Sequence, residues 1–176
     1  MLSVFDGLRD VTTLSVFVRL ACALICGGII GIERSYKRRP AGFRTHILIC
    51  IGAAITTLTS QYLYLNMHYF TDMARLGAQV VAGIGFIGAG TIIVTKRQRV
   101  KGLTTAAGLW TSAIIGLTFG GGFYEGGILA TVFIMLAELV FSRIEYRVLE
   151  NVPEINLYME YEDKHCLDDV LQRSEE

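Results

Sequence analysis

The dominant feature of the sequence is a series of long apolar stretches separated by short polar segments. Five such stretches occupy most of the first 142 residues, at about 11–32, 45–64, 76–94, 103–120 and 122–141. Each approaches the roughly 20 helical residues needed to cross a hydrocarbon core about 30 Å thick. The pattern predicts an all-α integral membrane domain of about five transmembrane helices over residues 1–142, and it excludes a soluble enzyme.

The division between the fourth and fifth stretches rests on three consecutive glycines, Gly120 to Gly122. Glycine reaches positive φ without steric cost, so a very tight turn is feasible there. Without that turn the count changes, and four or six crossings are the alternatives. Residues 1–10 contain no basic leader, so we expect the first stretch to remain as a membrane anchor rather than to be a cleaved signal.

Charge is segregated along the chain, although the formal net charge at pH 7 is zero. Ten of the sixteen acidic residues lie in 145–176, and nine of the sixteen basic residues lie in 34–44 and 96–101. Both basic segments connect predicted helices, so the positive-inside rule places them in the cytoplasm. The N-terminus is then outside, and an odd number of crossings brings the C-terminal segment into the cytoplasm.

Residues 143–176 have a soluble character that differs from the rest of the chain. Apolar and polar positions alternate over residues 155–161 with the period of a half-buried strand, and a short helix is expected at 167–173. One strand and one helix cannot bury a core by themselves. We interpret this segment as a short cytoplasmic α+β tail, the truncated start of a domain.

Gly83, Gly85 and Gly88 match the G-x-G-x-x-G dinucleotide fingerprint letter for letter. That fingerprint requires a preceding strand and an acidic residue about 20 positions later, whereas apolar residues continue here on both sides. Close helix packing is the better interpretation, because small residues let helix backbones approach in lipid. The predicted packing glycines are Gly83, Gly85, Gly88 and Gly90, and small-xxx-small spacing also relates Gly27 to Gly31 and Gly116 to Gly120.

The four cysteines are Cys22, Cys26, Cys50 and Cys166, and three of them lie inside predicted helices. Buried, inert thiols are the expected state. A soft-metal site at Cys22 and Cys26 would need further sulfur or imidazole ligands, for which only His46 and Cys50 are placed. The histidines fall at different depths with no nucleophile pattern beside them, so the sequence does not predict hydrolytic catalysis.

A few polar side chains fall inside the predicted helices, where each is costly unless it is paired or hydrated. Arg19 lies about 12 Å from the outer end of the first helix, and its candidate partners are Glu125 and Asp72. Glu138 lies near the cytoplasmic end of the fifth helix. These groups either hold the helices together or line a hydrated, functional interior, and the sequence favours neither role for any single residue.

A second group of polar residues gathers where the predicted helices end in the cytoplasm. It consists of Glu33, Arg34, Arg44, Thr45, His46, Thr104 and Thr105, and Gln79 near the outer end of the third helix is a further ligand candidate. Arg34 and Arg44 beside two helix N-termini would favour an anion such as a phosphate or lipid headgroup, and either could pair with Glu138. Magnesium prefers carboxylates and water, for which Glu33 is the best candidate ligand. Ordinary positive-inside charge is the competing explanation.

Four motifs in order carry a family resemblance. They are Gly31-Ile-Glu-Arg34, Arg39-Pro-Ala-Gly-Phe-Arg-Thr-His46, Gln79-Val-Val-Ala-Gly-Ile-Gly-Phe-Ile-Gly-Ala-Gly90 and Lys101-Gly-Leu-Thr-Thr-Ala-Ala107. Over residues 11–141 the chain resembles the MgtC/SapB family. The resemblance implies a multi-pass protein of the bacterial inner membrane, linked to growth at low magnesium and, in pathogens, to virulence through survival inside macrophages. It also implies that the tail begins an ACT-like domain.

Two functions of different class follow from these features. The first is a non-enzymatic regulator that acts through partner proteins, among which the resemblance suggests the F-type ATP synthase. The alternative is a transporter of magnesium or another ion or small solute through the helical bundle. We favour the regulator, because the polar motif residues cluster at the cytoplasmic side and the outer half has few carboxylates. The glycine-lined faces predict a homo-oligomer in the lipid bilayer, such as a dimer, while magnesium is the one candidate cofactor and no nucleic-acid binding is expected.

Overall fold

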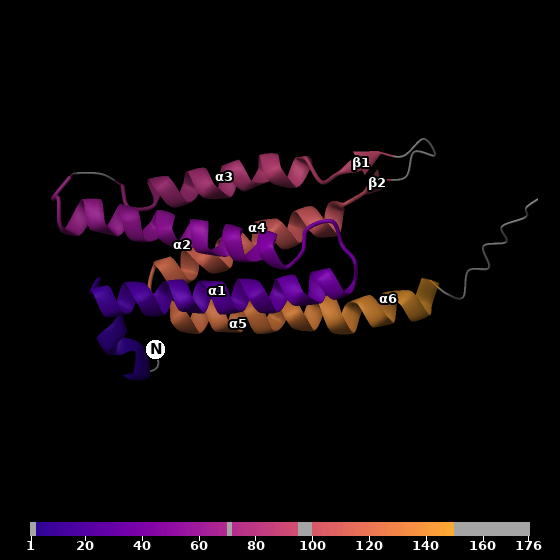
Figure 1. Ribbon diagram of the computed structural model, residues 1–176, viewed down its shortest axis with the longest axis horizontal. Helices are drawn as coiled ribbons and strands as arrows, with labels where there is room; N and C mark the ends of the chain where they lie inside the picture. Colours follow the sequence, from indigo (N-terminus) through magenta and orange to yellow (C-terminus); the bar gives the residue numbers. More distant parts are fainter. Residues whose placement is uncertain (1–2, 70–71, 95–99, 150–176) are drawn as a thin grey trace, which may run out of the picture. The chain divides into compact units, whose positions relative to one another are not determined.

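The computed structural model describes residues 3–69, 72–94 and 100–149, and these are mainly helical (Figure 1). The chain divides into two compact units, Met1–Leu139 and Val140–Glu176, each of which is described by itself. The elements in chain order are a 3-10 helix Ser3–Leu8, the helices α1 (Thr13–Tyr36), α2 (Phe43–Leu65) and α3 (Arg75–Ala89), the strands β1 (Ile93–Val94) and β2 (Val100–Lys101), α4 (Leu103–Gly120), α5 (Tyr124–Leu136), a π-helical turn Ala137–Phe141, and α6 (Ser142–Leu149).

Among the described residues, four helical segments are long and apolar enough to cross a membrane. They are Thr13–Tyr36, Phe43–Leu65, Leu103–Gly120 and Tyr124–Ile144. The third predicted stretch is also helical, but α3 has 15 residues and ends at Ala89 rather than near residue 94. At 1.5 Å per residue it measures about 22 Å, which is less than the roughly 30 Å of a hydrocarbon core. The prediction of five spanning helices is therefore confirmed for four.

The chain after α3 changes from helix to strand. The Thr91 hydroxyl donates to Gly88 O at 2.7 Å, just beyond the end of the helix. β1 and β2 then pair antiparallel, with Ile93 opposite Lys101. The strand and helix predicted for the tail, at 155–161 and 167–173, lie outside the described residues.

Local sequence explains where α1 begins and where α4 turns into α5. The Thr12 side chain accepts from the Ser15 amide (3.2 Å), and the Ser15 hydroxyl oxygen accepts from the Thr12 amide (2.9 Å). This capping box satisfies two backbone donors that a helix leaves unpaired at its start. The predicted glycine turn is also confirmed: Gly122 has φ +76°, a conformation that residues with a Cβ rarely adopt.

α2 packs against both α1 and α4, and glycines on these neighbours allow the close approach. A Cβ added at Gly31 of α1 would lie 2.7 Å from Phe43 Cα. On α4, a Cβ added at Gly120 would lie 2.5 Å from Ala54 O. The small-xxx-small pairs predicted on the first and fourth helices are therefore the positions where those helices meet α2.

We expect Gly31→Ala to lower the free energy of unfolding by about 1–3 kcal/mol, because the new methyl group would overlap the α2 backbone. Gly52→Ala is the matched control, since a Cβ at Gly52 would have no neighbour within 4 Å. Helix propensity should make that change neutral or stabilising by up to about 1 kcal/mol. Thermal unfolding of the detergent-solubilised protein measures both. Equal melting temperatures for the two variants would contradict the assigned helix contact.

The glycines of α3 behave differently from those of α1 and α4. A Cβ at Gly88 would lie 3.3 Å from Ala106 Cβ, so this glycine packs on α4. Gly83 and Gly85 would each place a Cβ in open space, and Gly90 would meet only carbonyls of its own helix. Of the four glycines predicted to pack on other helices, only Gly88 does so within the described chain. The G-x-G-x-x-G letters, residues 83–88, lie inside α3, so they do not form the strand-to-helix loop that the dinucleotide fingerprint requires.

Candidate functional site

Two groups of buried polar side chains lie near opposite ends of α1. Arg19 is the centre of one group and Arg34 of the other, 15 residues or about 22 Å apart along the helix. Both arginines are at most 1% exposed, which is rare for this residue and requires specific partners. We call these groups the Arg19 cluster (Arg9, Arg19, Gln61 and Glu125) and the Arg34 cluster (Glu33, Arg34, Lys37, His46, Thr105 and Glu138).

The Arg34 guanidinium joins three parts of the bundle. Nη1 donates to Glu138 Oε2 at 2.9 Å, and Nη2 donates to Thr105 Oγ1 at 3.2 Å. Glu138 reaches Arg34 from the turn that follows α5, and Thr105 reaches it from the first turn of α4. The sequence offered two arginines as partners for Glu138, and the structure places Arg34 there. A buried, charge-assisted bond of this kind fixes the end of α1 against α4 and α5.

The π-helical turn lets Glu138 bind α1 twice. Its carboxylate binds Arg34, while its backbone carbonyl accepts from Lys37 Nζ at 2.6 Å. π-turns inside helices are rare and frequently occur at functional sites. The sequence assigned Lys37 to ordinary cytoplasmic charge and missed this contact. Its position four residues after Glu33 is the spacing at which opposite charges meet on one helix face, and it indicates the ion pair with Glu33 but not the contact with Glu138.

Glu33, Arg34 and His46 each keep a buried polar atom without a hydrogen-bond partner among the described residues. Glu33 Oε1 lies 2.6 Å from Lys37 Nζ, an ion-pair contact that lacks hydrogen-bond angles, and Glu33 Oε2 and Arg34 Nε have no partner. His46 Nδ1 bonds to Gly42 O at 2.9 Å, whereas Nε2 is unpaired. Because a carbonyl can only accept, Nδ1 carries the hydrogen, and Nε2 of the neutral ring is an acceptor.

These unpaired atoms make the Arg34 cluster the best candidate for a ligand site. Nearly all buried polar groups in proteins bind a protein group or ordered water. A carboxylate oxygen, an imidazole nitrogen and a guanidinium nitrogen in one cluster can together bind a small polar ligand through both donors and acceptors. Its two acids and two bases balance each other, so the cluster has no net attraction for either sign of charge.

The protein residues do not by themselves form a metal site in the described part of the chain. No group of three or more His, Cys, Asp or Glu side chains lies close enough to hold an ion within residues 3–69, 72–94 and 100–149. In that part of the chain, Cys22 and Cys26 therefore lack a third His, Cys, Asp or Glu side chain that would complete a soft-metal site. Magnesium binding by Glu33, completed by water, stays a prediction. Lys37 already supplies a positive charge beside that carboxylate.

The remaining predicted ligand residues lie outside the Arg34 cluster. Arg44 and Thr104 are exposed, Thr45 is half-buried, and Gln79 is exposed on α3. The predicted anion site needed two free arginines, but the Arg34 guanidinium is bound to a carboxylate. Anion binding at this end of the bundle would therefore fall to Arg44, and it stays a prediction.

The Arg19 guanidinium is held by neutral oxygens. Nη1 donates to Gln61 Oε1 and to Gly120 O, both at 2.8 Å, and Nη2 donates to Arg9 O at 2.6 Å and Leu8 O at 3.3 Å. One side chain thus connects α1 to α2, to the end of α4 and to the segment that precedes α1. The prediction that an acidic residue pairs with Arg19 was wrong, because uncharged carbonyl oxygens bind the guanidinium instead.

The two acids proposed for Arg19 bind elsewhere. Glu125 Oε1 accepts from Arg9 Nη2 at 2.6 Å, and Asp72 Oδ1 accepts from the Ala74 amide at 2.9 Å. Arg9 lies before α1, outside the spanning segments, and its contacts with Asp6 and then Glu125 raise the pKa of its guanidinium. Arg9 is therefore the cation that neutralises Glu125, which the sequence did not reveal.

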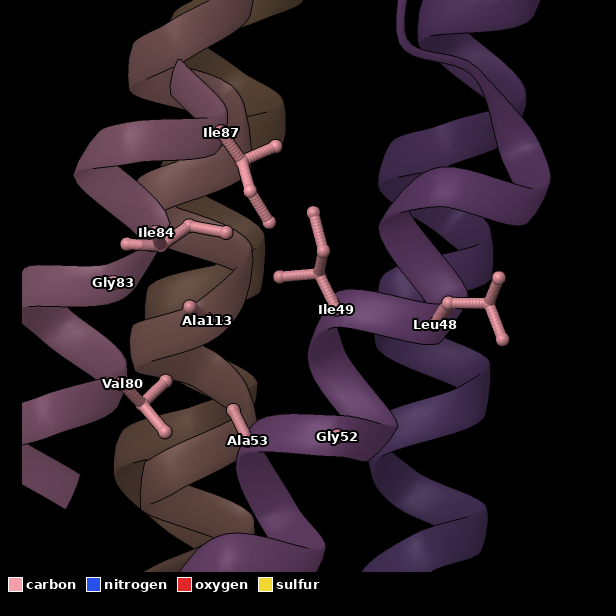
Figure 2. A pocket seen from close by; sticks show the side chains of 9 residues that line it. All are labelled: Leu48, Ile49, Gly52, Ala53, Val80, Gly83, Ile84, Ile87 and Ala113. Carbon is pink, nitrogen blue, oxygen red and sulfur yellow. The ribbon is translucent and has the colours of Figure 1, made fainter. Parts of the chain in front are cut away.

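An apolar groove lies between α2 and α3, with α4 as its floor (Figure 2). Its volume is about 230 Å³. Ile49 and Gly52 line it on α2, Gly83 and Ile84 line it on α3, and Ala113 lies on α4 (Figure 2). The lining has no titratable side chain, so the groove offers a surface for packing rather than for chemistry.

In the described part of the chain, four helices are long and apolar enough to cross a membrane, and a buried arginine near each end of α1 binds neighbouring segments. These features define a multi-pass helical membrane protein. The model of the MgtC family matches residues 20–147, and the chain belongs to this family. No solved structure matches the chain.

Three relatives illustrate the relationship. YhiD of Escherichia coli K12 is 42% identical over 141 residues, which cover 78% of this chain and 65% of YhiD. An uncharacterized protein of Haemophilus influenzae Rd is 40% identical over 129 residues, covering 70% and 54%. MgtC of Salmonella typhimurium LT2 is 37% identical over 131 residues, covering 74% and 54%. The matched part of the chain thus spans less than two thirds of the length of these curated relatives.

Proposed function

We propose that this protein is a non-enzymatic regulator of the bacterial inner membrane that acts in magnesium homeostasis through partner proteins. Membership of the MgtC family and the name MgtC carried by a 37% identical relative support the link to this system. The proposal includes a cytoplasmic location for the Arg34 cluster, which follows from the positive-inside rule. It also includes growth or virulence at low magnesium as the phenotype, with the F-type ATP synthase as a candidate partner.

The observation that carries this proposal is the apolar packing between the two arginine clusters. Ala23, Ile30, Ile115 and Phe119 are at most 1% exposed and fill the space among α1, α2, α4 and α5. Buried hydroxyls in this layer bond to carbonyls of their own helix, as Ser112 does to Gly108 O at 2.9 Å. This apolar layer separates the two groups of charged residues, which favours regulation over transport.

Transport of magnesium or another small solute is the second candidate. Its support is the printed name of YhiD from Escherichia coli K12, which describes a candidate magnesium transporter. Within this chain, the unpaired buried atoms of Glu33 and His46 would bind the solute along such a path. A path would then require a rearrangement that opens the apolar layer.

Growth of a deletion strain in limiting magnesium tests the regulator. We expect the unaltered chain to restore growth and Glu33→Gln to restore it poorly, because an amide cannot supply the carboxylate charge. Glu33→Gln also breaks the ion pair with Lys37, whose Nζ lies 2.6 Å from Glu33 Oε1, so the melting temperature should fall and is measured beside growth to show that the variant is still folded. Asp72→Asn, at an exposed acid, is the control and should restore growth fully. Full growth with Glu33→Gln would contradict a role for the cluster.

Vesicles that contain the purified protein and a trapped magnesium-sensitive dye separate the two functions. We expect no magnesium entry above that of protein-free vesicles. A magnesium-specific rise in melting temperature that Glu33→Gln abolishes would instead reveal a folded-state ion site, since ligand binding stabilises by about 2.7 kcal/mol at a hundred times Kd. Magnesium entry that depends on Glu33 would replace the regulator with the transporter.

A further inference from the structure

A second apolar groove lies between the last turns of α1 and the end of α5, two helices that run side by side (Figure 1). Its volume is about 390 Å³, within the range of about 300–1,000 Å³ found for small-ligand sites. Most of its lining is apolar and partly exposed, so the groove is open to the surrounding lipid. We call it the α1–α5 groove, and its lining residues are Ile29, Ile32, Glu33, Tyr36, Met135 and Leu139.

Glu33 is the charged residue in this lining, and it is 7% exposed. Lys37 Nζ lies 2.6 Å from Glu33 Oε1, whereas Oε2 has no hydrogen-bond partner within residues 3–69, 72–94 and 100–149. Nearly all buried polar groups in proteins are hydrogen-bonded, and a carboxylate oxygen can only accept. The groove therefore suits a ligand that is mostly apolar and carries one strong hydrogen-bond donor.

The position of the groove along α1 gives this ligand an orientation in the membrane. α1 has 24 residues and measures about 36 Å, compared with about 30 Å for a hydrocarbon core. Glu33 lies within one turn of the helix end at Tyr36, close to the boundary between hydrocarbon and headgroups. Ile29 lies one turn before Glu33, about 6 Å deeper. A ligand in the groove thus has its polar end at headgroup level and its apolar part among the acyl chains.

We propose that the α1–α5 groove binds phosphatidylethanolamine from the surrounding bilayer, with the lipid ammonium on Glu33 and an acyl chain along Ile29 and Ile32. A primary ammonium has three N–H donors and a positive charge, which Oε2 lacks as a partner. Charge-assisted hydrogen bonds of this kind are stronger than neutral ones. Both carboxylate oxygens are covered from water, so the Glu33 side chain rotates to meet the ammonium in the groove that it lines.

Charge and donor chemistry favour this lipid over other phospholipids. The two acids and two bases of the Arg34 cluster balance each other, so a headgroup of zero net charge adds no imbalance. Phosphatidylglycerol adds a negative charge and has no cation to place on Glu33. Phosphatidylcholine is also zwitterionic, but its methylated ammonium has no N–H to donate. The phosphate of phosphatidylethanolamine lies toward the exposed bases Arg38 and Arg39, which follow α1 at the same end.

The inference concerns a residue that the proposed function also uses, but it does not depend on that function. Lipid binding is measured on the purified protein, whereas the regulatory role is measured as growth of cells. Either result can therefore fail while the other holds.

Native mass spectrometry of the whole chain, released from bilayers of known composition, tests the proposal. The bilayers contain equal amounts of phosphatidylethanolamine and phosphatidylcholine with the same acyl chains, so the two lipids differ only in their headgroups. We expect the chain to retain phosphatidylethanolamine about tenfold more than phosphatidylcholine, the lower end of what a hydrogen bond to a charged group contributes. Equal retention of the two lipids, or retention of neither, would overturn the proposal. So would a preference for phosphatidylglycerol when this lipid is added.

Two variants separate the carboxylate from its ion pair. Glu33→Gln and Lys37→Gln both break the contact between these residues, but only Glu33→Gln removes the carboxylate. Glu33→Gln should therefore lose the preference for phosphatidylethanolamine, and Lys37→Gln should keep it. The same lipid preference in both variants would contradict recognition by Glu33.

A further pair of variants locates the lipid in the groove. Ile32 is 59% exposed, so Ile32→Trp fills the groove without disturbing the core, and it should remove most of both retained lipids. Leu129→Trp is the control, because Leu129 is 56% exposed on α5 and lies outside the lining. It should retain phosphatidylethanolamine as the unaltered chain does. Unchanged lipid retention by Ile32→Trp would place the lipid elsewhere and overturn the proposal.

Discussion

Replacing Arg19 with methionine should lower the free energy of unfolding by at least about 3 kcal/mol. Four hydrogen bonds from a charged donor are lost, each worth about 1.5–3 kcal/mol net, and the oxygens that they satisfied stay buried. Removal of the buried charge itself offsets part of this loss. For a chain of this size the melting temperature should fall by roughly 6–12 °C. Thermal unfolding in detergent, followed through the single tryptophan, Trp110, measures the change.

Two further variants separate the geometry of Arg19 from its charge. Arg19→Lys keeps the charge but cannot reach several oxygens at once, because an ammonium lacks the planar fork of a guanidinium. It should therefore lose nearly as much stability as Arg19→Met. Arg9→Met removes a more exposed cation and should cost less than Arg19→Met. Stability within about 0.5 kcal/mol of the unaltered protein for Arg19→Met would place the arginine outside the core of the fold.

Removing Glu138 should be the second large change. Glu138→Leu leaves the Arg34 guanidinium buried, with Thr105 as its one side-chain hydrogen-bond partner among the described residues. Breaking a buried ion pair in this way costs about 3–5 kcal/mol, because one charge is left uncompensated. The backbone contact between Lys37 and the Glu138 carbonyl does not need the side chain, so the loss reports on the carboxylate. Thermal or denaturant unfolding in mixed micelles measures it.

A double-mutant cycle isolates the ion pair. Arg34→Met and Glu138→Leu should each destabilise strongly, and the variant with both changes should be more stable than Glu138→Leu alone, since no unpaired charge remains. The coupling between the two positions should then be about 1–3 kcal/mol. Additive losses would show that Arg34 and Glu138 do not interact in the membrane-embedded protein. The Arg34 cluster would then lose the contact that connects α1 to the turn after α5.

Much of the architecture could be predicted from the chain alone. The apolar stretches located all five helices, because burial in lipid demands continuous hydrophobicity that is visible without any tertiary information. Small-xxx-small spacing identified Gly31 and Gly120 as contact positions, since close backbone approach requires the absence of a side chain. The turn at Gly122 followed from a local backbone requirement. Each of these features depends on residues that are neighbours in the sequence.

The long-range partners could not be predicted. Arg19 binds the carbonyl groups of Leu8, Arg9 and Gly120. Because every residue has a backbone carbonyl, the sequence does not indicate which ones a side chain will contact. The sequence suggested Arg19 as the partner of Glu125, and only the path of the chain before α1 brought Arg9 to it.

The third helix and the candidate site show the same contrast between what could be predicted from the sequence and what depends on long-range contacts. Composition predicted an apolar segment up to residue 94, whereas α3 ends at Ala89 and Ile93 pairs with Lys101 between β1 and β2. The sequence by itself determined which segments enter the membrane and which side chains are costly there. Only the tertiary structure decided how each helix is rotated about its axis. That rotation brings Glu138 to Arg34 and leaves Arg44 and Gln79 exposed, because a charge far along the chain becomes a neighbour only when packing turns its helix face toward it.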